Sequence, residues 1–143
     1  MALALHYPAL PTVDLETCKD HERKITPRCW DLPLVQQGVR TSRLSLVFAP
    51  TASASLLEMN WAVADVRCLI CALSASRYRD SEWCRVGQQR PPGPPLAADT
   101  YVMGFDRMRG EENQKTRPWL YLKFSVKEAS SKLLVLRIHP ENP

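Results

Sequence analysis

Two segments near the end of the chain alternate apolar and polar residues with the two-residue period of a β-strand. In residues 119–127 (WLYLKFSVK), the apolar face holds Leu120, Leu122, Phe124 and Val126. In residues 133–139 (LLVLRIH), the same alternation gives an apolar face made of Leu134, Leu136 and Ile138. A third strand is predicted over residues 100–108. The pattern indicates a small antiparallel sheet in the last third of the chain.

Helical patterns precede these strands. Residues 51–58 and 61–73 are rich in helix-forming residues, and Asn60 is the predicted N-cap of the second helix. A short helix is predicted over residues 31–39, and a short strand over residues 43–48, which Pro50 ends. Helices followed by an antiparallel sheet are typical of the α+β class, here with the N-terminal helices packed on one face of the sheet.

The domain organisation follows from length and from the distribution of proline. Residues 1–40 contain little sustained periodicity and are interpreted as an N-terminal arm or irregular lead-in. Residues 41–143 form a single α+β domain, because a chain of 143 residues with 45% hydrophobic content is long enough for one core. Residues 87–98 (GQQRPPGPPLAA) are predicted to be a proline-rich loop within that domain.

The two alternating strands also predict their own register. Directly opposite residues of an antiparallel pair share a face, so the two apolar faces coincide only if paired positions sum to an even number. Pairing Glu128 with Lys132 meets this condition and leaves a three-residue turn. Extended along the strands, this register places Lys123 opposite Arg137 and Tyr121 opposite His139, on the face away from the apolar residues.

Two cations opposite each other cost stability unless an anion lies between them. One interpretation is a solvated sheet face on which Lys123 and Arg137 extend into water. The other is a phosphodiester site, in which cations bind phosphate while His139 exchanges a proton and Tyr121 orients the substrate. The 2′-hydroxyl of RNA would then attack the adjacent phosphorus, so that DNA is not cut.

Charge and hydropathy restrict the possible partners. The net charge of +4 permits a polyanionic partner without requiring one. No apolar run reaches the roughly 18 residues that span a bilayer, and the first residues lack the pattern of a secretory signal. We therefore expect a cytoplasmic protein without a membrane partner.

The five cysteines leave several interpretations open. Cys68 and Cys71 lie in an apolar helical pattern and are expected to pack in the core, although their spacing also occurs in redox motifs. Cys18, His21 and Cys29 have some of the spacing of a zinc site, without an obvious fourth ligand. Cys84, next to the proline-rich segment, is a candidate exposed thiol.

Residues 44–141 resemble the MqsR toxins of bacterial type II toxin–antitoxin systems. The resemblance follows the order of segments: ASLLEMNWAVADVRCLICALS, SASRYRDS, TYVMGFDRM, WLYLKFSV and LLVLRIHPE. It implies a RelE-like fold, endoribonuclease activity without a metal or other cofactor, and an antitoxin protein as partner. Tyr121 matches an active-site tyrosine of that family, and His139 takes the place of its final lysine. The family's tyrosine–lysine pair corresponds to Arg79 and Asp80, and its tryptophan–glutamine pair to Val102 and Met103.

Two hypotheses follow. In the first, the protein is an mRNA interferase, a metal-independent hydrolase of RNA, in which Tyr121, His139 and Arg79 are catalytic. Substrate phosphates are then held by Lys123 and Arg137, and Arg107 extends the patch. In the second, the same fold is a non-catalytic module that binds RNA or protein, because Val102 and Met103 cannot replace a catalytic glutamine.

Overall fold

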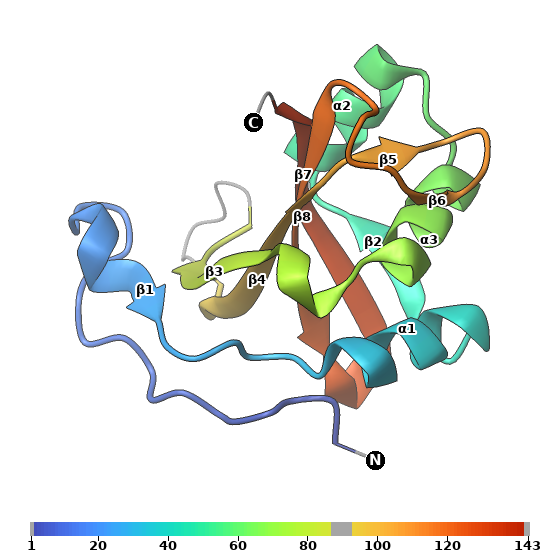
Figure 1. Ribbon diagram of the computed structural model, residues 1–143. Coiled ribbons are helices and arrows are strands. Elements are labelled where there is room, and N and C mark those ends of the chain that lie inside the picture. Colours follow the sequence, from blue (N-terminus) through green and yellow to red (C-terminus); the bar gives the residue numbers. More distant parts are fainter. Residues whose placement is uncertain (1, 87–92, 142–143) are drawn as a thin grey trace.

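A six-stranded sheet organises the computed structural model, which describes residues 2–86 and 93–141 (Figure 1). The strands lie in the order β1 (Lys24–Ile25), β3 (Tyr78–Cys84), β4 (Leu96–Met103), β7 (Trp119–Lys127), β8 (Lys132–Glu141) and β2 (Ser45–Phe48). Only β2 and β8 pair in parallel, and the other neighbours are antiparallel. A separate hairpin joins β5 (Phe105–Asp106) and β6 (Glu111–Glu112). The predicted α+β class is confirmed.

Three α-helices in the described part of the chain precede most of the sheet: α1 (Leu32–Arg40), α2 (Pro50–Met59) and α3 (Val63–Ala72). The carboxylate of Asp31 accepts a hydrogen bond from the Leu34 N–H and caps α1, so the helix begins one residue later than predicted. The prediction that Asn60 begins the second helix was wrong. Asn60 ends α2 in the left-handed conformation, with φ of 57°, and the Asp65 carboxylate binds the Ala62 N–H at the start of α3.

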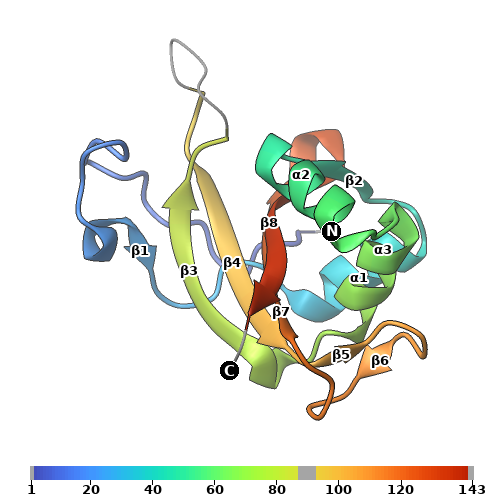
Figure 2. The ribbon, with the colours of Figure 1, turned by 90° about the horizontal axis from the view of Figure 1, so that it is seen from above.

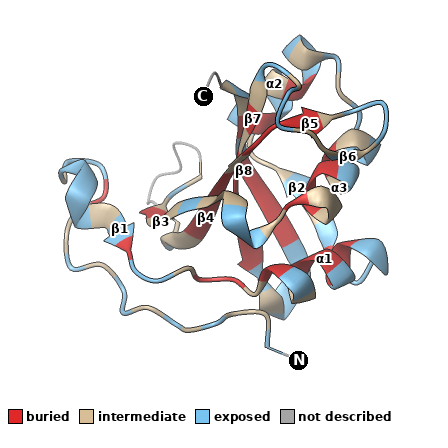
Figure 3. Cartoon of the chain, viewed as in Figure 1, coloured by how far each residue is buried: buried red, intermediate tan, exposed pale blue. Residues whose placement is uncertain are grey.

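The helices lie towards one edge of the sheet, and β1 lies at the other edge (Figure 2). The main core combines residues of α1 and α3 with the inner faces of the strands, including Val35, Ile70, Leu122, Phe124 and Ile138. A second, smaller cluster on the opposite face is made of Ala98, Leu134 and Leu136. Burial on both sides of β4, β7 and β8 makes these strands the most enclosed part of the molecule (Figure 3).

A β-bulge in β8 makes the predicted register correct on one side of the bulge and wrong on the other. Tyr121 pairs with His139 and Lys123 pairs with Arg137, as predicted. The next pair is Phe124 with Val135, so Leu136 is an extra residue in β8. The prediction that Leu134, Leu136 and Ile138 share one face was therefore wrong. The extra residue turns Leu134 and Leu136 to the second cluster, while Ile138 remains in the main core.

The turn between β7 and β8 also differs from the prediction. Lys127, not Glu128, pairs with Lys132, because the bulge shifts the register by one residue. Glu128 begins a 3-10 turn, and its carboxylate accepts hydrogen bonds from the Leu3 and Ala4 N–H groups and from the Tyr7 hydroxyl. Glu128 thus ties the N-terminal arm to the sheet.

Ser131 closes this turn with φ of 54°, a conformation that glycine adopts without steric cost. We expect Ser131→Gly to raise the free energy of unfolding by about 0.5–1 kcal/mol in urea denaturation. Ser130→Gly is the matched control, because Ser130 lies in the 3-10 turn and gains nothing from a positive φ. Equal effects of the two variants would contradict the explanation.

Several predicted elements are shifted. The strand expected over residues 100–108 is β4, which begins at Leu96 and ends before Gly104, where an added Cβ would collide with the Asn113 carbonyl. Of the predicted proline-rich loop, residues 87–92 lie outside the described residues and 96–98 belong to β4. Cys71 is half-buried and packs against the main core, as predicted, but Cys68 is exposed, so the prediction was wrong for Cys68. The strand β3 was not predicted.

Candidate functional site

Three successive cross-strand pairs of β7 and β8 lie on one side of the sheet. They are Trp119 with Glu141, Tyr121 with His139, and Lys123 with Arg137. Since residues two apart on a strand point the same way, these six residues form a continuous surface, which we call the polar face. Its three rows are about 7 Å apart along the strands.

The middle row is an aromatic stack. The rings of Tyr121 and His139 lie 4.5 Å apart between centroids, at an interplanar angle of 12°. Nδ1 of His139 lies 3.0 Å from the Pro140 carbonyl oxygen. An imidazole that donates Nδ1–H to this carbonyl keeps Nε2 available to accept a proton. The stack therefore presents a phenol and a proton-accepting nitrogen side by side.

Lys123 is buried, which excludes the interpretation in which it extends into water. Its ammonium group pairs with the Glu82 carboxylate of β3, and Nζ lies 5.8 Å from the centroid of the Tyr121 ring. Burial lowers the pKa of Lys123, but the hydrogen bond with Glu82 and the nearby Cys84 and Tyr121 more than offset this, so its pKa is raised. Lys123 is a charged group fixed against Tyr121.

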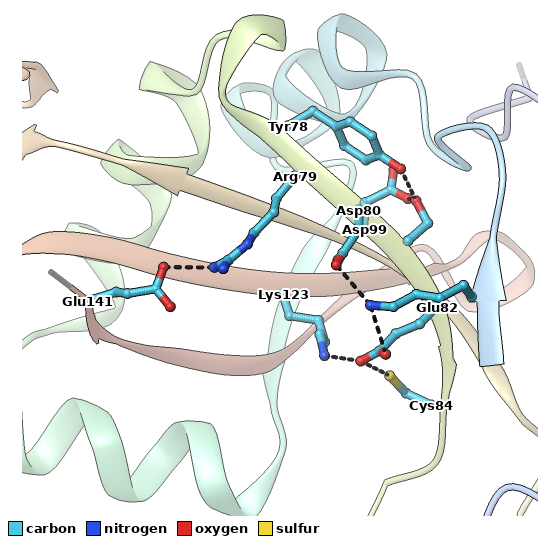
Figure 4. A network of polar contacts seen from close by, with 10 residues as sticks. Tyr78, Arg79, Asp80, Glu82, Cys84, Asp99, Lys123 and Glu141 are labelled. Atoms are coloured by element: carbon cyan, nitrogen blue, oxygen red, sulfur yellow. Dashed lines mark hydrogen bonds and ion pairs between the residues drawn. The ribbon is translucent and has the colours of Figure 1, made fainter. Parts of the chain in front are cut away.

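Glu82 belongs to a row of alternating charges that sequence reasoning missed. Lys24 of β1 lies between two carboxylates, at 2.9 Å from Asp80 and 3.6 Å from Glu82. Glu82 thus serves both Lys24 and Lys123, and Figure 4 shows these side chains in one network. Glu82 was missed because β3 was not predicted: the charged residues of this strand give no apolar alternation. Because β3 pairs with β4, the Glu82 carboxylate lies next to Lys123. Its negative charge explains why two cations can lie opposite each other on β7 and β8.

Arg79 contacts one end of the polar face, where it is paired. Its guanidinium lies 2.8 Å from the Glu141 carboxylate, so this ion pair spans from β3 over β4 and β7 to β8 (Figure 4). The hydrogen bond with Glu141 raises the pKa of Arg79, with smaller contributions from Asp80 and Tyr121. Beside this ion pair, a hollow of about 400 Å³ is lined by Tyr78, Val102 and Trp119.

A groove of about 550 Å³ borders the other end of the polar face. Its walls come from residues 20–24 of the arm, the end of β3 and the start of α2. Among the described residues, five cations line it against two carboxylates, Asp20 and Glu82: Arg23, Lys24, Arg85, Lys123 and Arg137. The first turn of α2 adds the positive end of a helix dipole. The groove is suited to an anion.

Arg107 lies apart from this surface. Its guanidinium donates hydrogen bonds to the Asn60 carbonyl at 2.8 Å and to Asp65 at 3.1 Å, and it lies 5.5 Å from the ring centroid of Trp61. The structure therefore does not bring Arg107 to the polar face. Val102 lies opposite Tyr121, and Met103 is buried in the core, so neither supplies a polar group to the site.

The cysteines form no metal centre in residues 2–86 and 93–141, where no three His, Cys, Asp or Glu side chains are grouped to hold an ion. Cys29 is buried, and burial raises the pKa of its thiol to about 12. Cys84 is half-buried beside the groove, and burial raises the pKa of its thiol to about 11. The prediction that Cys84 is an exposed thiol was therefore wrong.

Within residues 2–86 and 93–141, none of the helices has the length and hydropathy to cross a membrane.

Comparisons with protein families, with curated proteins and with solved structures returned no match. The resemblance to MqsR toxins therefore stays a prediction.

Proposed function

We propose that this protein is a metal-independent endoribonuclease whose active site is the polar face. The observation that supports it is the stack of Tyr121 on His139, placed between the Arg79–Glu141 pair and a cationic groove. Cleavage of a phosphodiester requires a proton acceptor for the attacking hydroxyl and cations that stabilise the negative charge that develops at phosphorus.

In the proposed reaction, Nε2 of His139 accepts the proton of a 2′-hydroxyl. The 2′-oxygen forms a bond to the adjacent phosphorus, and the bond from phosphorus to the 5′-oxygen breaks. The leaving oxygen takes a proton from water, which in turn receives the proton held by His139. The products are a 2′,3′-cyclic phosphate and a 5′-hydroxyl. Tyr121 orients the scissile phosphate, and Arg79 supplies positive charge to it.

Lys123 has a different role in this proposal from the other cations. Its ammonium group is held by Glu82 and lies against Tyr121, so it positions the phenol and adds charge from beneath the stack. The resemblance to toxins adds a partner, an antitoxin protein that neutralises the activity in the cytoplasm. The RelE-like arrangement of the sheet is part of the same proposal.

The decisive experiment is RNA cleavage in EDTA. We expect His139→Ala to reduce the cleavage rate at least about 100-fold, because it removes the proton acceptor. His6→Ala is the matched control, since His6 hydrogen-bonds the Pro27 carbonyl of the arm and lies outside the polar face. DNA and 2′-O-methyl RNA should remain intact. Absence of cleavage by the wild type, or equal cleavage by His139→Ala, would refute the proposal.

A non-catalytic RNA-binding module is the second candidate. It is favoured by Val102 and Met103, which offer no hydrogen bond at the position where the toxins it resembles have a glutamine. This candidate predicts that RNA binds with salt-dependent affinity and is recovered uncut.

A further inference from the structure

The groove contains more positive charge than its own carboxylates balance. Lys24 and Lys123 share Glu82, and Lys24 also pairs with Asp80. Arg23 donates hydrogen bonds to the Leu15 carbonyl and to Cys18 Sγ. Within the described residues, the guanidinium groups of Arg85 and Arg137 make no hydrogen bond or ion pair. These two exposed guanidinium groups are available to a ligand.

The position of the groove relative to the aromatic stack is fixed by strand geometry. Arg137 and Lys123 form the row next to Tyr121 and His139, about 7 Å along the strands. The β8 bulge adds Leu136 beside Arg137, and both line the groove, so the bulge helps to direct this part of β8 at it. Tyr121 also lines the groove, so a ligand group held by Arg137 lies one row away from the stack and directly next to it.

We propose that the groove is a second phosphate subsite, which holds the phosphate next to the scissile one in a single-stranded RNA. Arg137 and Arg85 bind it directly, and the start of α2 contributes its dipole. The inference rests on the proposed function for naming RNA as the ligand. It adds that the enzyme engages at least two consecutive phosphates, so that a dinucleotide with a single phosphate is a poor substrate.

The arrangement favours a phosphate over a carboxylate ligand. Two separate guanidinium groups, with the start of α2 in the same lining, match an anion whose oxygens point in several directions. Glu82 does not repel this anion strongly, because two ammonium groups neutralise it. Asp20 is the remaining carboxylate of the lining, and it belongs to the arm at the wall of the groove.

The test uses 2′-O-methyl oligonucleotides, which bind without being cut. One phosphate at a time is replaced by an uncharged methylphosphonate, and affinity is measured by fluorescence anisotropy at several salt concentrations. We expect one position to lower affinity about tenfold and to reduce the salt slope by about 1. In the Arg85→Gln/Arg137→Gln variant, the same replacement should have no effect. Arg109→Gln, which changes a guanidinium beside Asp106 and Glu111, is the matched control.

The outcomes separate this subsite from the proposed function. A loss spread equally over all phosphates, or a position-specific loss that persists in the double variant, overturns the subsite. If the position-specific loss is found but ordinary RNA is not cleaved by the wild type, the endoribonuclease proposal fails and the subsite stands. Cleavage of ordinary RNA without any position-specific loss leaves the endoribonuclease and removes the subsite.

Discussion

Replacing Asp99 with alanine is expected to lower the free energy of unfolding by about 4–6 kcal/mol. Asp99 is fully buried in β4, and its carboxylate accepts hydrogen bonds from the Cys29 N–H at 3.0 Å, the Trp30 N–H at 2.9 Å and the Ser81 hydroxyl at 2.5 Å. Alanine leaves the two backbone N–H groups without a partner in the protein interior, at about 1–3 kcal/mol each. It also removes the charged acceptor of the Ser81 hydroxyl, which keeps the Tyr78 hydroxyl at 2.6 Å as a partner. These bonds join the arm to β3 and β4, so the loss affects both.

Urea denaturation of three variants tests this expectation. Asp99→Asn keeps one acceptor oxygen and should lose less stability than Asp99→Ala. Asp80→Ala is the matched control on the neighbouring strand, because Asp80 forms a partly exposed pair with Lys24 and should cost no more than about 1 kcal/mol. If Asp99→Ala and Asp80→Ala cost the same, the carboxylate of Asp99 does not hold the arm in place.

The pairing of Tyr121 with His139 was predictable because two strands with clear alternation constrain each other. An even sum of paired positions was enough to place both residues opposite each other on one face. The bulge at Leu136 was not predictable, since leucine residues on both sides of β8 fit either register. The structure distinguishes the two registers, because it places Leu134 and Leu136 in the smaller apolar cluster on the second face of the sheet.

The partner of Lys123 was missed for a different reason. Residues 78–84 contain several charged side chains, of which Glu82 lines the groove, and such a strand has no apolar period to reveal it. Without β3, Lys123 opposite Arg137 looked like an uncompensated pair of cations. Likewise, the start of α2 meets the groove through tertiary packing, which local sequence patterns do not encode. The predicted endoribonuclease activity is tested by RNA cleavage in EDTA.

Replacing Glu82 with leucine is expected to lower the free energy of unfolding by about 3–5 kcal/mol, because Lys123 then stays buried without a counter-charge. Lys123→Met should cost less, since Lys24 remains 3.6 Å from Glu82. The double variant should recover most of the loss, because it replaces both charges with apolar groups of similar size. Urea denaturation of the four proteins gives the coupling between the two residues.

The dependence on pH identifies Lys123 as the group responsible. In the wild type the pKa of Lys123 is raised above 10.5, so its stabilising contribution is present below pH 10.5 and is lost as the pH rises through the raised value. In Glu82→Leu, burial dominates and lowers the pKa of Lys123. The variant is therefore destabilised at neutral pH and regains stability as the pH approaches 10.5. The stability difference between the two proteins should therefore narrow at alkaline pH. A difference that stays constant from pH 7 to 11 would assign the loss to packing instead of charge.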